Sequence, residues 1–319
     1  SYATVKRALP VYATEPFRHR MSAALAKRAA IGPASLVLYD VTTLYFETDK
    51  ADELRIPGFS KERRLEPQIV VGLLADASGF PLEVTAFEGN RAETLTMLPV
   101  IRRFMKTHRL TDVTIVADAG MVSDANKKAL EAEGLSFIIG ERVPKTPYVV
   151  AEWRAAYPGA EIDDGQIFTQ PWPAGPKDGR RDHVIYYQYR ADRARRTLRG
   201  IDEQIKKAQA AIAGKAAIKR NRFVRLTGGN RTLNRELEAK TRAVAGIKGY
   251  ITNRFDLTPE QVIGAYHQLW HVEKAFRMSK HDLKARPIYH RTKDSIDAHL
   301  TIVTAAMATG LGRTGERSV

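Results

Sequence analysis

The chain has 319 residues, a formal net charge of +15 and a pI near 9.9, and this length fits one large domain or two ordinary domains. Cysteine is absent from the sequence, which excludes disulfide bonds and thiolate metal sites, so any metal site must use Asp, Glu or His. No segment reaches the roughly 18 apolar residues of a membrane-spanning helix, and the N-terminal sequence lacks the apolar run of a signal peptide. We therefore expect a cytoplasmic protein.

The first part of the chain predicts strands followed by alternating helices and strands. Residues 1–32 have a basic, helical pattern that ends at Gly32-Pro33, and residues 35–47 are rich in the residue types that favour a strand. The elements predicted after a polar loop are a hairpin at 67–90, a helix at 93–108, a strand at 112–120, a helix at 123–134 and a strand at 135–142. The order β-β-β-α-β-α-β predicts an α/β fold, with helices packed on a mixed sheet.

Residues 144–245 interrupt this alternation, and we interpret them as an insertion. The predicted elements within it are a loop or linker at 171–181, a strand at 183–190, charged helices at 191–213 and 233–245, and a strand and turn at 221–229. After the insertion we expect a strand at 249–253, one continuous helix at 257–280 and an apolar helix at 293–312.

The positive charge is concentrated within this insertion. Residues 180–242 contain 18 Lys/Arg and 6 Asp/Glu, a net charge of +12, whereas the rest of the chain carries only +3. Such a local excess attracts polyanions, and nucleic acid is the first candidate. The alternative is an ordinary solvated face of a charged helix.

Three carboxylates occupy unusual positions in the predicted elements. Asp40 lies inside an apolar strand, Asp118 at the end of another, and Glu273 on the helix that follows the last strand. An aspartate in a buried strand requires a partner or a metal. Three carboxylates brought to one point repel each other unless a cation lies among them, and hard cations such as Mg²⁺ or Mn²⁺ take oxygen ligands. Two such ions can support phosphodiester cleavage.

The stretch YHQLWHVEKAFRMSK, residues 266–280, places Tyr266, Glu273 and Lys280 seven residues apart. On one continuous helix these three side chains would share a stripe. Tyr266, Arg277 and Lys280 would then be placed to hold phosphates beside a metal bound by Glu273. The alternative is a surface ion pair between Glu273 and Arg277, worth roughly 0.3–0.5 kcal/mol.

These blocks together resemble the DDE transposases of bacterial insertion sequences. The resemblance covers residues 35–305 and includes LYDVTTLYFE, the segment from FSKERR to GNRAET, VADAGMVSDAN and the region after Glu273. The branch it resembles carries a Tyr-x2-Arg-x3-Glu-x6-Lys signature, which reads here as Tyr266, Leu269, Glu273 and Lys280. Leu269 stands where the signature has arginine, and Arg277 is the nearest candidate to replace it.

The resemblance implies a ribonuclease-H-like fold with an insertion before the last catalytic helix. It implies that Asp40, Asp118 and Glu273 are catalytic and bind Mg²⁺ or Mn²⁺, as two ions. Water would cleave a phosphodiester at the element's end, and the freed 3′-OH would attack target DNA, which is cut-and-paste transposition. It also implies double-stranded DNA as the partner, a homodimer in the DNA complex, and a bacterial protein associated with the nucleoid.

The expected domain boundaries follow from these patterns. We expect a remnant of an N-terminal helical region at 1–32, a ribonuclease-H-like core at 33–143 and 246–312, the basic insertion at 144–245 and a tail at 313–319. We expect the insertion to contact DNA through seven basic residues: Arg190, Arg193, Arg195, Arg196, Lys219, Arg220 and Arg222.

Two other functions remain open from the sequence alone. A nuclease of the same fold would use the same carboxylates but only hydrolyse DNA. A decayed transposase would retain the charge and bind DNA without metal affinity or cleavage. Metal-dependent cutting separates the decayed protein from both enzymes, and joining of a 3′-OH end to a target separates the transposase from the nuclease.

Overall fold

The chain divides into two compact units in a computed structural model. The structure describes residues 2–32, 35–59, 65–215, 221–227 and 230–315. The first unit comprises Ser1–Ile139, Ala174–Arg181 and Thr252–Val319, and the second comprises Gly140–Pro173 and Asp182–Ile251.

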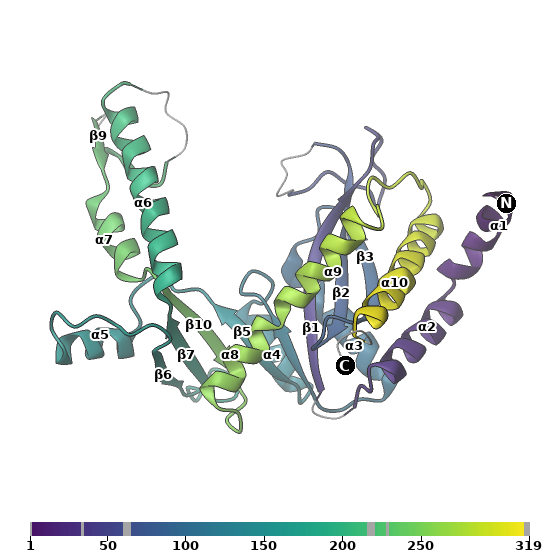
Figure 1. The fold of residues 1–319 in the computed structure, drawn as a ribbon, viewed down its shortest axis with the longest axis horizontal. Helices are drawn as coiled ribbons and strands as arrows, with labels where there is room; N and C mark the ends of the chain where they lie inside the picture. Colours follow the sequence, from purple (N-terminus) through teal and green to yellow (C-terminus); the bar gives the residue numbers. More distant parts are fainter. Residues whose placement is uncertain (1, 33–34, 60–64, 216–220, 228–229, 316–319) are drawn as a thin grey trace. The chain divides into compact units, whose positions relative to one another are not determined.

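The strands of the first unit are five neighbours in a mixed sheet (Figure 1). Its strands are β1 (Ser35–Tyr45), β2 (Gln68–Asp76), β3 (Pro81–Glu88), β4 (Val113–Ala117) and β5 (Ser136–Glu141), in the spatial order β3-β2-β1-β4-β5. β2 is antiparallel to both β1 and β3, whereas β4 is parallel to β1 and β5 is parallel to β4. This arrangement confirms the predicted α/β fold, in which helices pack on a mixed sheet.

The sequence explains why the β2–β3 hairpin forms. β2 is almost entirely apolar and is buried along its length except at Asp76. The Asp76 carboxylate accepts hydrogen bonds from the backbone N–H groups of Ser78 and Phe80 at 2.8 and 2.9 Å, which is a local turn typical of aspartate. Gly79 follows with φ of +83°, a conformation that glycine adopts without strain.

Helices cover both faces of this sheet. The helices that follow β3 and β4 are α3 (Met97–His108), preceded by the short 3₁₀ helix η1 (Glu93–Leu95), and α4 (Asp124–Ala132), whose first turn Ser123 caps. The β3 side chains alternate: Glu83 accepts a hydrogen bond from Arg103 of α3 at 2.6 Å, whereas Val84 packs in the cluster that contains Leu300 of α10 (Lys293–Gly315) on the other face.

The predicted continuous helix over residues 257–280 is wrong at Gln268. Two helices occupy this segment, α8 (Pro259–His267) and α9 (Leu269–His281). Thr258 caps α8 in a reciprocal capping box with Gln261. At the junction the Gln268 N–H bonds to Ala265 at 3.1 Å and the Gln268 carbonyl accepts from His271 at 2.9 Å. These three-residue spacings are a 3₁₀-type turn, which interrupts the α-helical pattern on which a seven-residue stripe depends.

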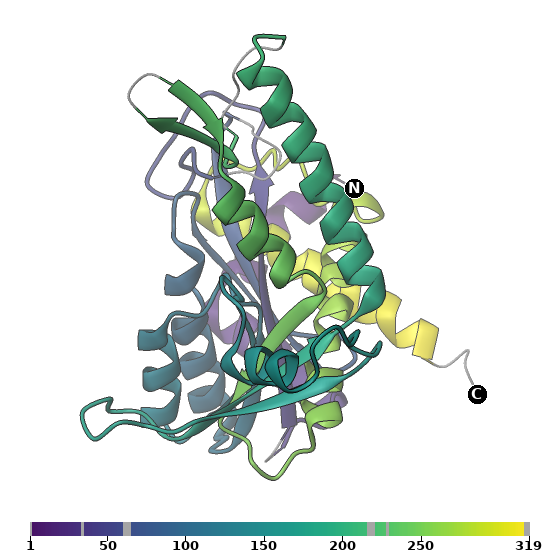
Figure 2. The ribbon, with the colours of Figure 1, turned by 90° about the vertical axis from the view of Figure 1, so that its left-hand side faces the viewer.

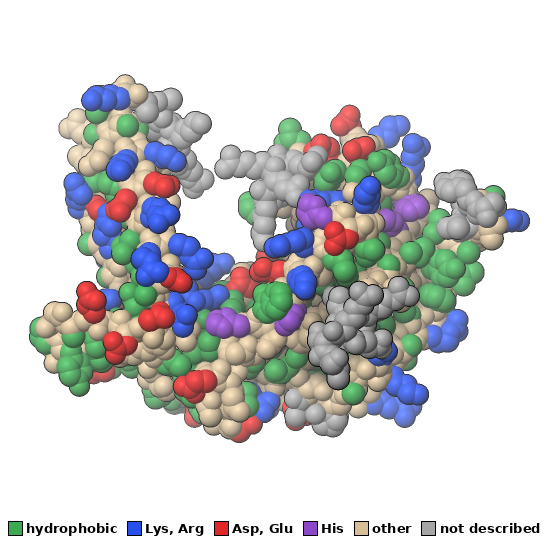
Figure 3. Space-filling model, in the orientation of Figure 1, with side chains coloured by type: hydrophobic (Ala, Val, Ile, Leu, Met, Phe, Trp, Pro, Cys, Tyr) green, Lys and Arg blue, Asp and Glu red, His purple; other side chains and the backbone are tan. Residues whose placement is uncertain are grey.

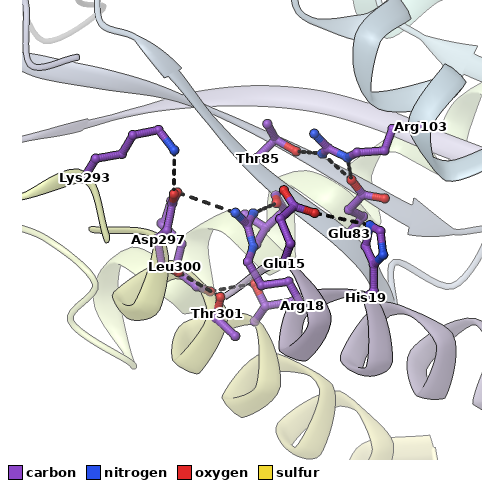
Figure 4. Close-up of polar contacts among 12 residues, drawn as sticks. Glu15, Arg18, His19, Glu83, Thr85, Arg103, Lys293, Asp297, Leu300 and Thr301 are labelled. Carbon is purple, nitrogen blue, oxygen red and sulfur yellow. Dashed lines mark hydrogen bonds and ion pairs between the residues drawn. The ribbon is translucent and has the colours of Figure 1, made fainter. Parts of the chain in front are cut away.

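The predicted helical N-terminal region consists of α1 (Tyr2–Ala13) and α2 (Glu15–Arg28). Figure 4 shows how α2 is attached to the rest of the first unit. Arg18 donates to the backbone oxygen of Val84 at 2.9 Å and lies 3.7 Å from the buried carboxylate of Asp297 on α10. Lys293 also contacts this carboxylate, at 2.9 Å. These contacts join α2 to an edge strand and to the C-terminal helix.

The second unit has its own strands, in the order β10-β7-β6. Its elements are α5 (Tyr148–Ala156), β6 (Ile167–Trp172), β7 (His183–Tyr189), α6 (Ala191–Ile212), β8 (Val224–Thr227), β9 (Asn230–Leu233), α7 (Arg235–Ala243) and β10 (Ile247–Thr252). The sequence did not predict α5 or β6. Pro171 and Trp172, which we expected in a loop or linker, instead pair with Val184 and His183 of β7.

A small separate core holds the long helix of the second unit. Ile201, Ile205 and Ala208 of α6 pack against the fully buried Phe223, and Leu233 of β9 borders them. Figure 2 shows α6 beside the β8–β9 hairpin and α7. The opposite face of α6 is left exposed, and most of the charged residues of this helix lie there.

Candidate active site

Adjacent parallel strands place Asp40 and Asp118 beside each other. In the register of β1 with β4, Leu38 lies opposite Val116. Asp40 is two residues after Leu38, and Asp118 is two residues after Val116. Because side chains two residues apart in a strand lie on the same face of the sheet, the two aspartates occupy equivalent positions on the face that Leu38 and Val116 share. Asp40 is half-buried within β1, and Asp118 is exposed directly after the last residue of β4.

Each aspartate has one oxygen held by a hydrogen bond. The backbone N–H of Val41 donates to Oδ1 of Asp40 at 2.8 Å. The hydroxyl of Tyr266 donates to Oδ1 of Asp118 in a short contact. Tyr266 lies in the last turn of α8 and is only 6% exposed. The sequence predicted Tyr266 as a phosphate contact from its spacing to Glu273, and nothing in that spacing indicated Asp118 as its partner.

Helix α9 presents Glu273 on an exposed face. The buried face of α9, which includes Val272, Ala275 and Phe276, packs against β1. The exposed face, at helical spacing, consists of Trp270, Glu273, Lys274, Arg277 and His281. Because Tyr266 is buried on a different helix and Lys280 is half-buried, the prediction that Tyr266, Glu273 and Lys280 share one stripe is wrong. Glu273 and Arg277 do share the exposed face.

Two residues of this face were missed by sequence reasoning. Trp270 is 52% exposed, and Nζ of Lys274 lies 5.6 Å from the centre of its ring. Trp270 is three residues before Glu273 and four before Lys274, and this helical spacing is the signal that could have placed them on one face. The exposed face of α9 therefore carries an aromatic ring, Trp270, and a cation, Lys274, next to the carboxylate of Glu273.

The oxygen donors fit a hard divalent cation in their chemistry. Asp40, Asp118 and Glu273 offer only carboxylate oxygens, the ligands that Mg²⁺ and Mn²⁺ prefer. A carboxylate has about four acceptor sites, so the single hydrogen bond from Tyr266 leaves Asp118 with sites that can bind a cation. Across the described part of the chain, however, no group of three or more His, Asp or Glu side chains lies close enough to hold a metal ion. The arrangement supplies two neighbouring aspartates and a glutamate on α9, the helix that packs against β1, the strand of Asp40.

The predicted DNA-binding residues of the second unit have different surroundings. Arg193 is half-buried and donates to the backbone oxygens of Gln188 and Gly246 at 3.4 and 3.3 Å. Arg190 lies 3.5 Å from Asp164, and Arg195 is paired with Asp192 in a close contact. Each of these three arginines therefore has a partner within the unit.

The other predicted basic residues are at the surface or outside the described part. Arg196 is exposed on α6. Arg222 donates to Gln204 at 3.2 Å and lies 4.7 Å from the ring centre of Phe223. Lys219 and Arg220 fall outside the described residues. Figure 3 shows Lys and Arg side chains interspersed with Asp and Glu over α6 and α7, so the positive charge on this face is not a single uninterrupted patch.

Comparison with known proteins identifies the class of this chain. Residues 31–309 match the family described as "Transposase DDE domain", and the chain belongs to that family. The cryo-EM structure of the piggyBac transposase synaptic complex with hairpin DNA is similar, with a TM-score of 0.48 and 11% identity. The similarity covers 88% of this chain and 47% of that one, so this chain spans about half the length of the piggyBac chain. No match is found among curated proteins.

None of the helices described here combines the length and apolar character that crossing a membrane requires.

Proposed function

We propose that this chain is the catalytic part of a cut-and-paste DNA transposase. The observation that carries the proposal is the alignment of Asp40 with Asp118 on adjacent parallel strands, with Glu273 on a helix that packs against one of them. Membership of the DDE domain family supports the same chemistry. We place the chain in the branch with the Tyr-Arg-Glu-Lys signature of bacterial insertion sequences, with Leu269 in place of the arginine.

The three carboxylates would hold two divalent cations, Mg²⁺ or Mn²⁺. When bound, such ions activate the attacking oxygen and stabilise the leaving oxygen of a phosphodiester. The protein's own contribution is to fix the ligands: the Val41 N–H orients Asp40, and the packing of α9 on β1 sets the position of Glu273. Arg277 shares the exposed face of α9 with Glu273, where a guanidinium can hold a DNA phosphate.

The basic second unit would bind the DNA that the first unit cuts. Within the proposed organisation, residues 33–143 and 246–312 form the catalytic core and residues 144–245 the insertion. Two compact units with boundaries near these positions support that organisation. Arg196 and Arg222 are the strongest candidates among the proposed contacts. Both are exposed to solvent, and Arg222 donates to the amide oxygen of Gln204 and not to a carboxylate. Binding two element ends requires at least two subunits, so we propose a homodimer in the DNA complex.

Cleavage of supercoiled plasmid tests this function. We expect the wild-type protein to nick plasmid with Mg²⁺ or Mn²⁺, and we expect Asp40→Asn, Asp118→Asn and Glu273→Gln each to reduce nicking at least about 100-fold. Asp124→Asn is the matched control, because Asp124 is exposed at the start of α4, where it pairs with Lys127.

The outcomes separate the candidate functions. Nicking together with joining of a 3′-OH oligonucleotide end to plasmid supports the transposase, and nicking without joining supports a hydrolytic nuclease. DNA binding without nicking in either metal supports a decayed protein that only binds. If the three variants cut as well as the wild type, the assignment of the site is wrong.

A further inference from the structure

Tyr266 makes a contact that its place in the sequence does not explain. Tyr266 lies in the last turn of α8, before the break at Gln268. Its hydroxyl reaches the end of β4 and donates to Oδ1 of Asp118. The ring is 6% exposed, so the rest of the residue is enclosed within the first unit.

This enclosure gives the hydroxyl a fixed direction. A buried tyrosine has few rotamers available, and its O–H requires a partner when it is removed from water. A hydrogen bond to an ionised carboxylate is stronger than one between neutral groups. Asp118 itself is exposed and follows the last residue of its strand, so its side chain would otherwise be free to change rotamer. The contact from Tyr266 restricts it.

The contact also relates two of the proposed metal ligands to each other. Tyr266 is four residues before the first exposed position of α9, Trp270, and seven before Glu273. The 3₁₀-type bonds at Gln268 join α8 to α9 directly. A shift of α8 would therefore move both the donor to Asp118 and the start of the helix that carries Glu273.

We infer that Tyr266 is a positioning residue that orients Asp118 for metal binding and fixes the approach of α9 to it. The inference rests on the proposed function, because it takes Asp118 as a metal ligand. The tyrosine hydroxyl occupies one acceptor site of the carboxylate, and the remaining sites can still bind a cation. Outer hydrogen bonds of this kind orient ligands in metal sites, and their loss typically lowers metal affinity roughly 10–100-fold.

The test compares Tyr266→Phe with Tyr289→Phe, because Tyr289 is 75% exposed in the same unit and provides the same change without the contact. Mn²⁺ binding is measured by electron paramagnetic resonance on DNA-free protein, and DNA affinity is measured separately in EDTA. We expect Tyr266→Phe to weaken Mn²⁺ binding about 10-fold or more and to leave DNA affinity unchanged. Tyr289→Phe should change neither.

Other outcomes overturn the inference. If Tyr266→Phe weakens DNA binding in EDTA and leaves Mn²⁺ binding intact, the hydroxyl is a phosphate contact. If neither quantity changes, the hydroxyl has no role in the site. If Mn²⁺ binding by the wild type is absent, or is unaffected by Asp118→Asn, the proposed metal site itself fails, and this result is distinct from a failure that is confined to Tyr266.

A second measurement tests the hydrogen bond between Tyr266 and Asp118 in the absence of metal. Urea unfolding of Tyr266→Phe, Asp118→Ala and the double variant forms a double-mutant cycle in the metal-free protein. We expect the tyrosine substitution to cost clearly less stability in the Asp118→Ala background than in the wild type. Strict additivity of the two substitutions would show that the hydrogen bond does not contribute, and it would overturn the inference even if Tyr266→Phe proved less stable for other reasons.

Discussion

At the scale of single residues, Leu269 shows how burial limits what one position can do. Its side chain is 9% exposed at the first position of α9, at the position where the proposed Tyr-Arg-Glu-Lys signature would have arginine. A guanidinium there would have to lose much of its hydration or displace its neighbours. The exposed Arg277 lies two turns further along the face of α9 that carries Glu273, so a cation is available near the glutamate without burial.

Substitution of this position gives a clear prediction. We expect Leu269→Arg to lower the free energy of unfolding by about 1–3 kcal/mol, because it adds volume and charge to a packed site, and not to increase DNA cleavage. Leu269→Met, which nearly conserves volume, should cost less than about 1.5 kcal/mol. Urea unfolding monitored by circular dichroism measures both, and a Leu269→Arg protein as stable as the wild type would contradict the burial argument.

At the scale of elements, the position of α9 depends on the hairpin beside it. Gly79, in the β2–β3 turn, lies so close to α9 that an added Cβ would be 2.6 Å from Cβ of His271. Atoms at that distance overlap, so the turn and the helix fit only with glycine. His271 is two residues before Glu273 on the same helix. The turn therefore sets the approach of the helix that carries the proposed catalytic glutamate.

A comparison of two glycines separates the effect of this close contact from the effect of the positive φ that glycine prefers. Gly79 and Gly134 have similar positive φ values, +83° and +77°, but nothing lies within 4 Å of an added Cβ at Gly134. We expect Gly134→Ala to cost about 1 kcal/mol of unfolding free energy from backbone strain alone. Gly79→Ala should cost about 1–3 kcal/mol more from the overlap and should also reduce plasmid nicking. Equal costs for the two variants would show that the turn does not constrain α9.

At the scale of the whole molecule, the element order and the pair of aspartates were predictable from the sequence. The strand and helix patterns in residues 35–142 are easily recognised in the sequence, because each of these elements buries an apolar face or an apolar run of residues. The order of these elements then predicts the mixed sheet. The break at Gln268 was not predictable, because its residue types are compatible with a continuous helix. Strand β6 was missed because Pro171 argues against a strand, yet β6 lies at an edge of its sheet, where proline is tolerated.

The stability of the molecule should also depend on its histidines. Burial lowers the pKa of His108, His271, His290 and His299 below the usual value of 6.5. Between the folded and unfolded pKa values the unfolded chain binds more protons, so stability is lost as the pH falls below about 6.5. His299 is the clearest case: its ring contacts the backbone oxygen of Ala285 at 3.1 Å, and its ring centre lies 5.4 Å from that of His290.

A substitution at His299 tests this pH dependence. We expect His299→Gln, which keeps a donor for the Ala285 oxygen, to make the fall in unfolding free energy between about pH 7 and pH 5 less steep than in the wild type. Urea unfolding at a series of pH values measures the slope. A steeper slope in His299→Gln, or a wild-type stability that rises as the pH falls, would contradict the assignment.

The central claim is that Asp40, Asp118 and Glu273 bind the metal that cuts DNA, and a thiol substitution tests it most directly. Because the chain has no cysteine, Asp118→Cys introduces a single sulfur ligand, which Mg²⁺ disfavours and softer ions accept. We predict that Asp118→Cys fails to nick plasmid in Mg²⁺ and recovers nicking in Mn²⁺ or Cd²⁺, whereas Asp124→Cys cuts in Mg²⁺ as the wild type does. Undiminished cutting by Asp118→Cys in Mg²⁺ would contradict the account.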